Sequence, residues 1–174
     1  MTLSRLQRLT DYSFTSTVGS GTTILKIAGA IHSSDDFMVT ALGSAKTYVV
    51  SGQAYEVLGP LAPQKITVNP GYYQTLGENA AADAFAGLSK ASGVKVVAGR
   101  GCTVAGISGT LYKEETPGNG GLLTIAQEGC VANQGGALLS FQEGVSGSAA
   151  PGSAGHVYRF AVTGVGNVGS IRAP

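Results

Sequence analysis

The sequence predicts an all-β fold: a β-sandwich or barrel of about ten short strands, with one or two short helices and an N-terminal arm. Short apolar runs recur every ~8–15 residues, and each is bounded by glycine, proline, asparagine or serine. Glycine supplies 27 of the 174 residues, about twice its usual ~7% share. Only one segment in the body of the chain has helical spacing.

The first expected strand is 22–31, where apolar Leu25, Ile27 and Ile31 alternate with polar positions. A tight hairpin is expected at Ser51-Gly52. A second is expected at 118–121, because Asn119-Gly120 tolerates the positive φ angles of a primed turn. The other expected strands are 46–50, 53–58, 64–69, 94–98, 102–107, 110–113, 122–127, 137–142 and 156–163.

The expected helix is Glu78–Ala91, whose apolar residues fall at spacings of three and four. Gly93 can end it. By contrast, Gly144–Gly155 holds too few large side chains to pack, so we expect a surface loop there.

Residues 1–20 differ from the rest and are expected to form the arm, with a Ser/Thr/Gly-rich hinge at 15–22. Their candidate contact residues are Leu3, Arg5, Leu6, Arg8 and Leu9. Two interpretations remain open: a short helix packed on its own domain, or an arm that docks on a neighbouring subunit. Residues 21–174 then form one β-rich domain, or two small β-subdomains that meet near 71–93.

The charge pattern excludes several function classes. Eleven Lys and Arg are scattered among ten Asp and Glu. Nucleic-acid binding needs clustered cations, and electrostatic membrane binding needs a polybasic segment. We expect neither partner. We expect no secretory signal and no membrane-spanning segment. We expect the chain to be synthesised in a host cytoplasm. Two cysteines are too few for a disulfide framework, so free buried thiols are favoured for Cys102 and Cys130. The alternative is that they pair, which requires the fold to bring their Cα atoms within about 7 Å.

Three patterns invite a catalytic or cofactor interpretation, and none supports one. Gly164–Gly169 has the spacing of a dinucleotide fingerprint, but no helix can follow in the five residues left. The residues of 32–36 are adjacent in one turn, where Asp35 or Asp36 is expected to cap backbone N–H groups. Glu114-Glu115 is expected in an exposed acidic loop. The chain is therefore expected to be no enzyme and to hold neither cofactor nor metal.

The low charge predicts association with other subunits. Only 12% of residues are charged and the net charge is +1, a composition that leaves an exposed surface associative. Small residues would then lie at subunit contacts. Tyr72 and Tyr73, after Pro70-Gly71, are further candidate partner contacts as an aromatic platform.

Two stretches carry a resemblance to a known family. Val94–Ile107 contains Val104-Ala-Gly-Ile107, and Gly121–Val131 contains the Thr124–Val131 strand. Over 94–131 the chain resembles the small β-domain of tailed-phage head decoration (cement) proteins. This resemblance implies a homotrimer that sits on the major capsid protein lattice, on the capsid exterior of the virion, without catalysis. Residues 1–93 depart from the family pattern and would add a further β-layer.

The sequence therefore predicts a virion structural protein, a capsid decoration or cement protein that stabilises the phage head by burying apolar surface across coat-subunit joints. Two alternatives are a phage tail or filament subunit, which would polymerise on itself, and an extracellular carbohydrate-binding or adhesin module. The last would use Tyr72, Tyr73 and the 144–155 loop.

Overall fold

The computed structural model describes residues 6–20, 23–41, 45–69, 71–89, 97–118, 122–147, 156–166, 168–172 and 174. Its strands and helices are β1 (Tyr12–Ser20), β2 (Thr23–Ile31), β3 (Phe37–Ala41), β4 (Ala45–Val50), β5 (Gln53–Leu58), β6 (Gln64–Ile66), the 3-10 helix η2 (Tyr72–Thr75), α1 (Gly77–Ser89), β7 (Val97–Val104), β8 (Ile107–Gly118), β9 (Leu123–Ala132), β10 (Leu138–Gly147) and β11 (His156–Val165).

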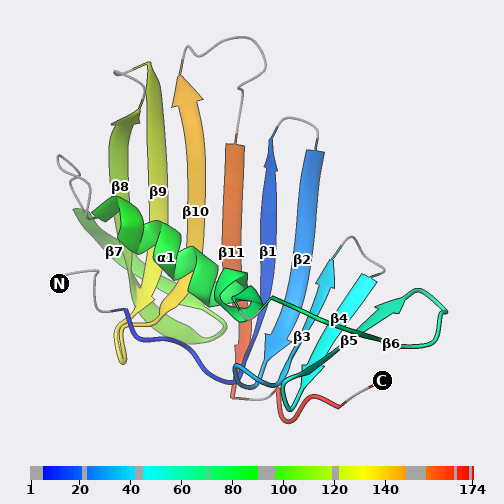
Figure 1. Ribbon diagram of the computed structural model, residues 1–174. Helices are drawn as coiled ribbons and strands as arrows, with labels where there is room; N and C mark the ends of the chain where they lie inside the picture. The colour runs from blue at the N-terminus through cyan, green and yellow to red at the C-terminus, as the bar shows by residue number, and fades with distance from the viewer. Residues whose placement is uncertain are drawn as a thin grey trace.

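The eleven strands form one antiparallel sheet in the order β6-β5-β4-β3-β2-β1-β11-β10-β9-β8-β7 (Figure 1). The all-β class is thus confirmed, but a single sheet takes the place of the expected sandwich or barrel. β1–β6 and β7–β11 are each a meander in which successive strands pair, and the pairing of β1 with β11 joins the two. Two subdomains were expected to meet near 71–93. In the structure, residues 71–89 connect the first meander to the second and contain η2 and α1.

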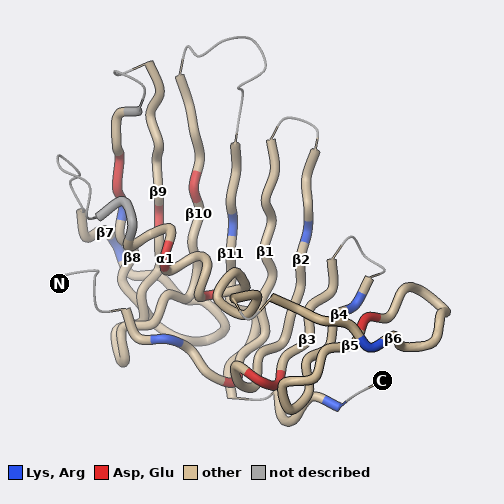
Figure 2. Tube along the Cα trace, viewed as in Figure 1, with Lys and Arg blue, Asp and Glu red and all other residues tan. Residues whose placement is uncertain are grey.

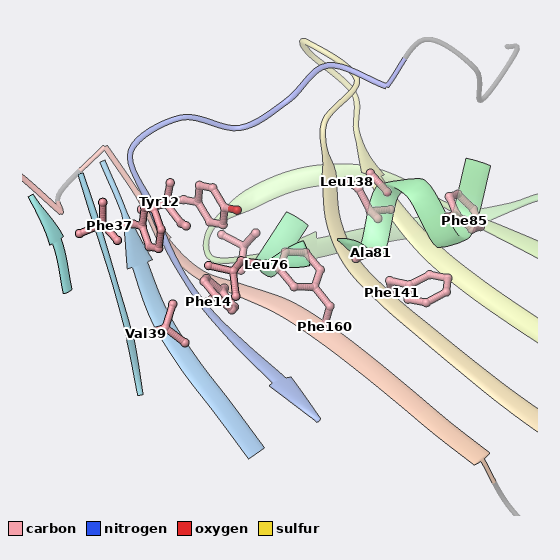
Figure 3. Close-up of a cluster of buried hydrophobic side chains, with 14 of the residues drawn as sticks. Tyr12, Phe14, Phe37, Val39, Leu76, Ala81, Phe85, Leu138, Phe141 and Phe160 are labelled. Atoms are coloured by element: carbon pink, nitrogen blue, oxygen red, sulfur yellow. The ribbon is translucent and has the colours of Figure 1, made fainter. Parts of the chain in front are cut away.

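α1 lies across one face of the sheet, and the upper parts of β8–β11, β1 and β2 extend beyond it (Figure 1). We call this the covered face and the opposite side the uncovered face. Alternate strand residues point to the two faces, so the cross-strand register assigns each side chain. Figure 3 shows the core between α1 and the sheet. Its members include Tyr12, Phe14, Phe37, Leu76, Ala81, Phe85, Leu138, Phe141 and Phe160.

Close packing of α1 depends on two glycines. Gly77 has φ +51, and a Cβ there would lie 2.7 Å from the Tyr12 hydroxyl oxygen, which accepts a hydrogen bond from the Glu78 amide at 3.0 Å. Gly129 in β9 lies beneath Phe85, since a Cβ at 129 would lie 2.9 Å from Phe85 Cζ. Glycine at both places lets the helix approach the sheet, and the helix begins one residue before the expected Glu78.

The expected arm requires correction, because residues 12–20 are β1 at the centre of the sheet, paired with β2 and β11 on its two sides. The segment is Ser/Thr-rich because its uncovered-face positions hold Ser13, Thr15 and Thr17. Its covered-face positions hold the buried rings of Tyr12 and Phe14. A strand that is apolar on one face only resembles a polar linker in composition.

Several other expectations are confirmed or moved. Ser51 and Gly52, with φ 49 and 75, form the expected turn between β4 and β5. β8 pairs with β9 as the expected hairpin, although residues 119–121 of its turn lie outside the described residues.

Other expected elements differ from the structure. The expected strand 102–107 instead spans the β7–β8 turn at Ala105-Gly106. β3 was not expected. Residues 144–147 of the expected loop belong to β10, and 148–155 lie outside the described residues.

The expectation of free thiols is wrong, because Cys102 and Cys130 form a disulfide with a Cα–Cα distance of 6.2 Å. They belong to β7 and β9, on either side of β8. Gly109 of β8 lies under the bridge, since a Cβ there would be 3.0 Å from Cys130 Sγ. At this corner the bridge and the β7–β8 hairpin bury a small second cluster, made of Leu111, Cys130, Ala132 and Leu139.

Candidate functional site

The uncovered face concentrates the cations of the sheet. Among the described strand residues, the register places Lys26, Lys46, Lys65, Lys113 and Arg159 on it, together with two carboxylates, Glu115 and Glu128. The result is a net of three positive charges on one side of a chain whose total is +1. On β8–β11, β1 and β2 the remaining positions are mainly Thr, Ser, Ala and Gly, whereas β3–β5 place Met38, Tyr48 and Tyr55 on this face.

The covered face has the opposite sign. Glu56, Glu114 and Glu143 point to it, while no Lys or Arg does so among the described positions of β1–β6 and β8–β11. Figure 2 shows where charged residues lie along the strands, and the register assigns each of them to a face. The near-zero net charge therefore conceals a separation of charge between the two faces.

A shallow hollow of about 370 Å³ lies in the middle of the uncovered face. Its lining comes from β1, β9, β10 and β11, and the uncovered-face side chains in it are Thr15, Thr17, Glu128, Ser140, Gln142, Arg159 and Ala161. Phe141 and Phe160 also line it, but their rings are buried in the core. A second hollow of about 190 Å³ adjoins it and shares Glu128 and Gln142. The two form a continuous depression across β8–β11 and β1.

Arg159 is the cation of this hollow. It is exposed, and in the part of the chain that the structure describes no carboxylate lies within ion-pair distance of its guanidinium. Glu128, on the other side of Gln142, instead pairs with Lys113, with 2.7 Å between Nζ and Oε2. The main-chain oxygen of Arg159 accepts a hydrogen bond from Ser16 Oγ at 3.1 Å, which fixes the strand but leaves the side chain available.

A row of polar side chains crosses the covered face just beyond α1. Glu114, Gln127, Glu143 and Tyr158 lie directly opposite one another on β8, β9, β10 and β11. Gln127 Nε2 donates to Glu143 Oε2, and Glu143 Oε1 lies 3.9 Å from His156 Nε2. Burial raises the pKa of the Tyr158 hydroxyl to about 12, a shift that Ser16 opposes by hydrogen bonding.

Glu114 is the anomalous member of this row. Its side chain is 1% exposed, and neither carboxylate oxygen has a hydrogen-bond partner; nor does the facing Gln127 Oε1. Desolvation by burial raises the pKa of Glu114. One proton on Glu114 would convert an unpartnered acceptor into a donor opposite Gln127 Oε1. The expected exposed acidic loop at Glu114-Glu115 is therefore wrong: both residues are in β8, and Glu114 points to the covered face.

The candidate contact residues of the N-terminal segment lie against their own domain where they are described. Leu6 and Leu9 pack on the core. Arg8 donates to the main-chain oxygens of Glu78 and Asn79 at 3.4 and 3.1 Å and pairs with Asp83. Leu3 and Arg5 lie outside the described residues. Residues 6–10 are not helical, so this segment binds α1 as an extended chain.

Arg8 also approaches the other buried carboxylate, with 3.8 Å between its Nη1 and Glu78 Oε2. The Glu78 side chain is 1% exposed. Burial raises the pKa of Glu78 to about 7, although Arg8 and main-chain contacts at Leu9 and Leu138 act to lower it. This cluster fastens the N-terminal segment to the start of α1 and offers no opening for a ligand.

Tyr72 and Tyr73 form part of the core boundary. Both are half-buried, and their ring centroids lie 6.1 and 5.8 Å from that of Phe37. They cover one end of the core beside β3, with part of each ring still open to solvent. The 144–155 loop was expected to act together with these tyrosines; its described residues, 144–147, are the end of β10.

The turn at 32–36 behaves as expected, because Asp36 Oδ1 accepts a hydrogen bond from the Ser51 amide at 2.7 Å. His32 lies 3.6 Å from Asp11. Within the described ranges, no three His, Cys, Asp or Glu side chains are placed to share a metal ion. The Gly164–Gly169 motif follows β11, and its described residues after 166 form neither strand nor helix.

Sequence reasoning missed the hollow. Arg159, Gln142 and Glu128 come from three strands, and their grouping depends on register. The available signal was alternation: in His156–Val165 the apolar Phe160 and Val162 imply that Arg159 and Ala161 point the other way.

No protein-family model matches the chain, and no curated protein matches its sequence. Neither of the described helices is long and apolar enough to cross a membrane.

Proposed function

We propose that this chain is a non-enzymatic binding protein that docks onto an acidic protein surface through its uncovered face. The observation that carries the proposal is the net positive charge on a broad sheet face of small and hydroxyl-bearing residues. The described residues place no helix or second sheet over this face apart from the β7–β8 corner.

The size of the face suits a specific protein interface. The six long strands β8–β11, β1 and β2 have 9–12 residues each. With ~4.8 Å between strands and ~3.3 Å per residue, they span roughly 850 Å². A stable interface buries about 800 Å² per partner. Small side chains permit close approach, and the cations select a partner of opposite charge.

The specific form of this proposal is the capsid decoration protein that the resemblance over 94–131 implies. The partner would be the major capsid protein lattice, with the chain a homotrimer on the outside of the phage head. Residues 97–118 and 122–131 of that stretch form β7, β8 and β9 at one side of the sheet. Lys113, Glu115 and Glu128 of these strands lie on the uncovered face.

The test is co-sedimentation with purified phage heads stripped of decoration proteins, at about 50 and 500 mM NaCl. We expect binding at low salt that weakens at high salt, because exposed charge pairs are screened. The triple variant Lys26→Gln/Lys46→Gln/Lys65→Gln should lose most binding. Arg172→Gln, which removes a cation of the C-terminal tail, is the matched control and should bind normally.

Binding that survives the triple variant, or that Arg172→Gln reduces equally, contradicts docking by this face. Polymerisation of the protein alone, seen by negative-stain microscopy, would instead support the tail or filament alternative.

A further inference from the structure

The hollow around Arg159 contains a feature that docking alone does not require: a guanidinium without a carboxylate partner, surrounded by hydrogen-bonding side chains. We propose that this hollow is a socket for a single carboxylate side chain, Asp or Glu, of the partner protein, with Arg159 as its anchor. The proposal rests on the proposed docking function and names the partner group that this site recognises.

The cross-strand register supports the socket. Thr17, Arg159 and Gln142 form one row across β1, β11 and β10. Thr15, Ala161 and Ser140 form the next row on the same strands. The second row holds only small side chains, so a depression remains beside the guanidinium. The hydroxyls and the Gln142 amide can donate to the oxygens of a carboxylate that is held by Arg159.

The charges around the hollow favour one carboxylate over other ligands. A guanidinium presents a planar fork that matches a carboxylate with two parallel hydrogen bonds. Lys113 already neutralises Glu128 at 2.7 Å, so Arg159 keeps an unshared positive charge. Glu128 and Glu115 nevertheless lie on the same face, and they would repel an extended polyanion such as a nucleic-acid backbone. A cationic ligand would meet Arg159 itself.

The surroundings favour a protein side chain over a free acid. The hollow is shallow and opens onto a wide face, so it would cover little of a free small molecule. A side chain projecting from a docked surface would gain the additional contacts of the face around it.

The experiment is a titration of ¹⁵N-labelled protein with the capped peptide Ac-Gly-Ser-Glu-Ser-Gly-NH2, which carries a single carboxylate, followed through the Arg159 Nε–Hε cross-peak at about 50 mM NaCl. We expect this cross-peak to shift on binding. Arg159→Gln should weaken binding at least tenfold, and Arg159→Lys should recover only part of it, since an ammonium lacks the planar fork. Lys26→Gln removes the same charge one strand further along the row and should weaken binding no more than about twofold.

Equal losses in Arg159→Gln and Lys26→Gln would overturn the socket, because general attraction to the face would then explain binding. Tighter binding of sodium glucuronate than of this peptide would overturn the assignment to a protein side chain. If Arg159→Gln still binds phage heads while the triple lysine variant does not, the socket fails and docking stands. If neither variant affects head binding, the proposed function fails first.

Discussion

The two faces of the sheet are built from the same strands but perform different tasks. The covered face packs Phe14, Phe160 and Phe141 into the core beneath α1, where Phe85 contacts Phe141, and the charged side chains that point to it from the described parts of β1–β6 and β8–β11 are carboxylates. The residues of the uncovered face alternate with those of the covered face along each strand. Many of them are small or hydroxyl-bearing, and most of the charged side chains among them are cations. Side-chain parity along a single strand separates the residues that build the core from those that would contact a partner in the proposed docking. Substitutions on the two faces should therefore have different consequences.

The largest effect should come from Phe85→Ala on the covered side. Phe85 is fully buried, and its ring centroid lies 5.8 Å from that of Phe141. Truncation leaves a cavity between α1 and the sheet, so the free energy of unfolding should fall by about 3–5 kcal/mol. Urea denaturation followed by circular dichroism measures this. A loss below 1 kcal/mol would show that α1 contributes little to the core.

The next largest effect should come from the Cys102–Cys130 bridge, which closes a separation of 28 residues. Constraint of the unfolded chain by a loop of this length stabilises the fold by roughly 3–4 kcal/mol. The double variant Cys102→Ala/Cys130→Ala should show this loss in thermal unfolding, and dithiothreitol should reproduce it in the natural chain. Dithiothreitol should leave the double variant unchanged, and any further destabilisation there would contradict the assignment to the bridge.

Glu78 should make stability depend on pH. Its native pKa of about 7 exceeds the ordinary 4.5, so the folded state holds the proton more tightly than the unfolded state. Stability should be greatest below about pH 4.5, fall as the pH rises, and level off above about pH 7, a loss on the order of 3 kcal/mol. Glu78→Gln should flatten this part of the curve, measured by urea unfolding from pH 4.5 to 8. Glu115→Gln, at an exposed position in β8, should retain the slope; its disappearance in that variant would assign the effect elsewhere.

The smallest effect on stability should come from the uncovered face. Arg159 is exposed and has no ion pair among the described residues, and substitutions at such surface positions change stability by about 0.5 kcal/mol or less. Arg159→Gln should thus unfold at the same urea concentration as the natural chain, while its partner binding is reduced. A stability loss above 1 kcal/mol would mean that Arg159 supports the fold, and the contrast between the faces would weaken.

Much of the fold could be predicted from local pattern. Strand 53–58 and the turn at Ser51-Gly52 were predicted as they occur, because alternation and turn chemistry are local properties. β1 could not be distinguished from a polar arm, since hydroxyl-bearing Ser13, Thr15 and Thr17 occupy its uncovered-face positions and Ser16 interrupts the apolar residues of its covered face. β3 has only five residues, too few for alternation to stand out after the 32–36 turn.

The candidate site was less predictable than the fold. No local pattern marks Arg159, because its neighbours in the hollow come from β1, β9 and β10. The burial of Glu114 could not be predicted from local pattern either, because it depends on which face of β8 the residue occupies and on the strands beside it. The Arg8 contacts with Glu78 and Asp83 join residues about 70 positions apart, beyond the range of any spacing argument.

The sequence by itself determined the all-β class, the single helix near 78–89 and the low charge, because these follow from composition and from periods of two and 3.6 residues. Only the tertiary structure decided that eleven strands form one sheet, that Cys102 meets Cys130, and that the cations gather on one face. The physical reason is range. Periodicity relates residues that are neighbours in the chain. Register relates residues of distant strands, because it places their side chains in one row, and here it depends on the pairing of β1 with β11.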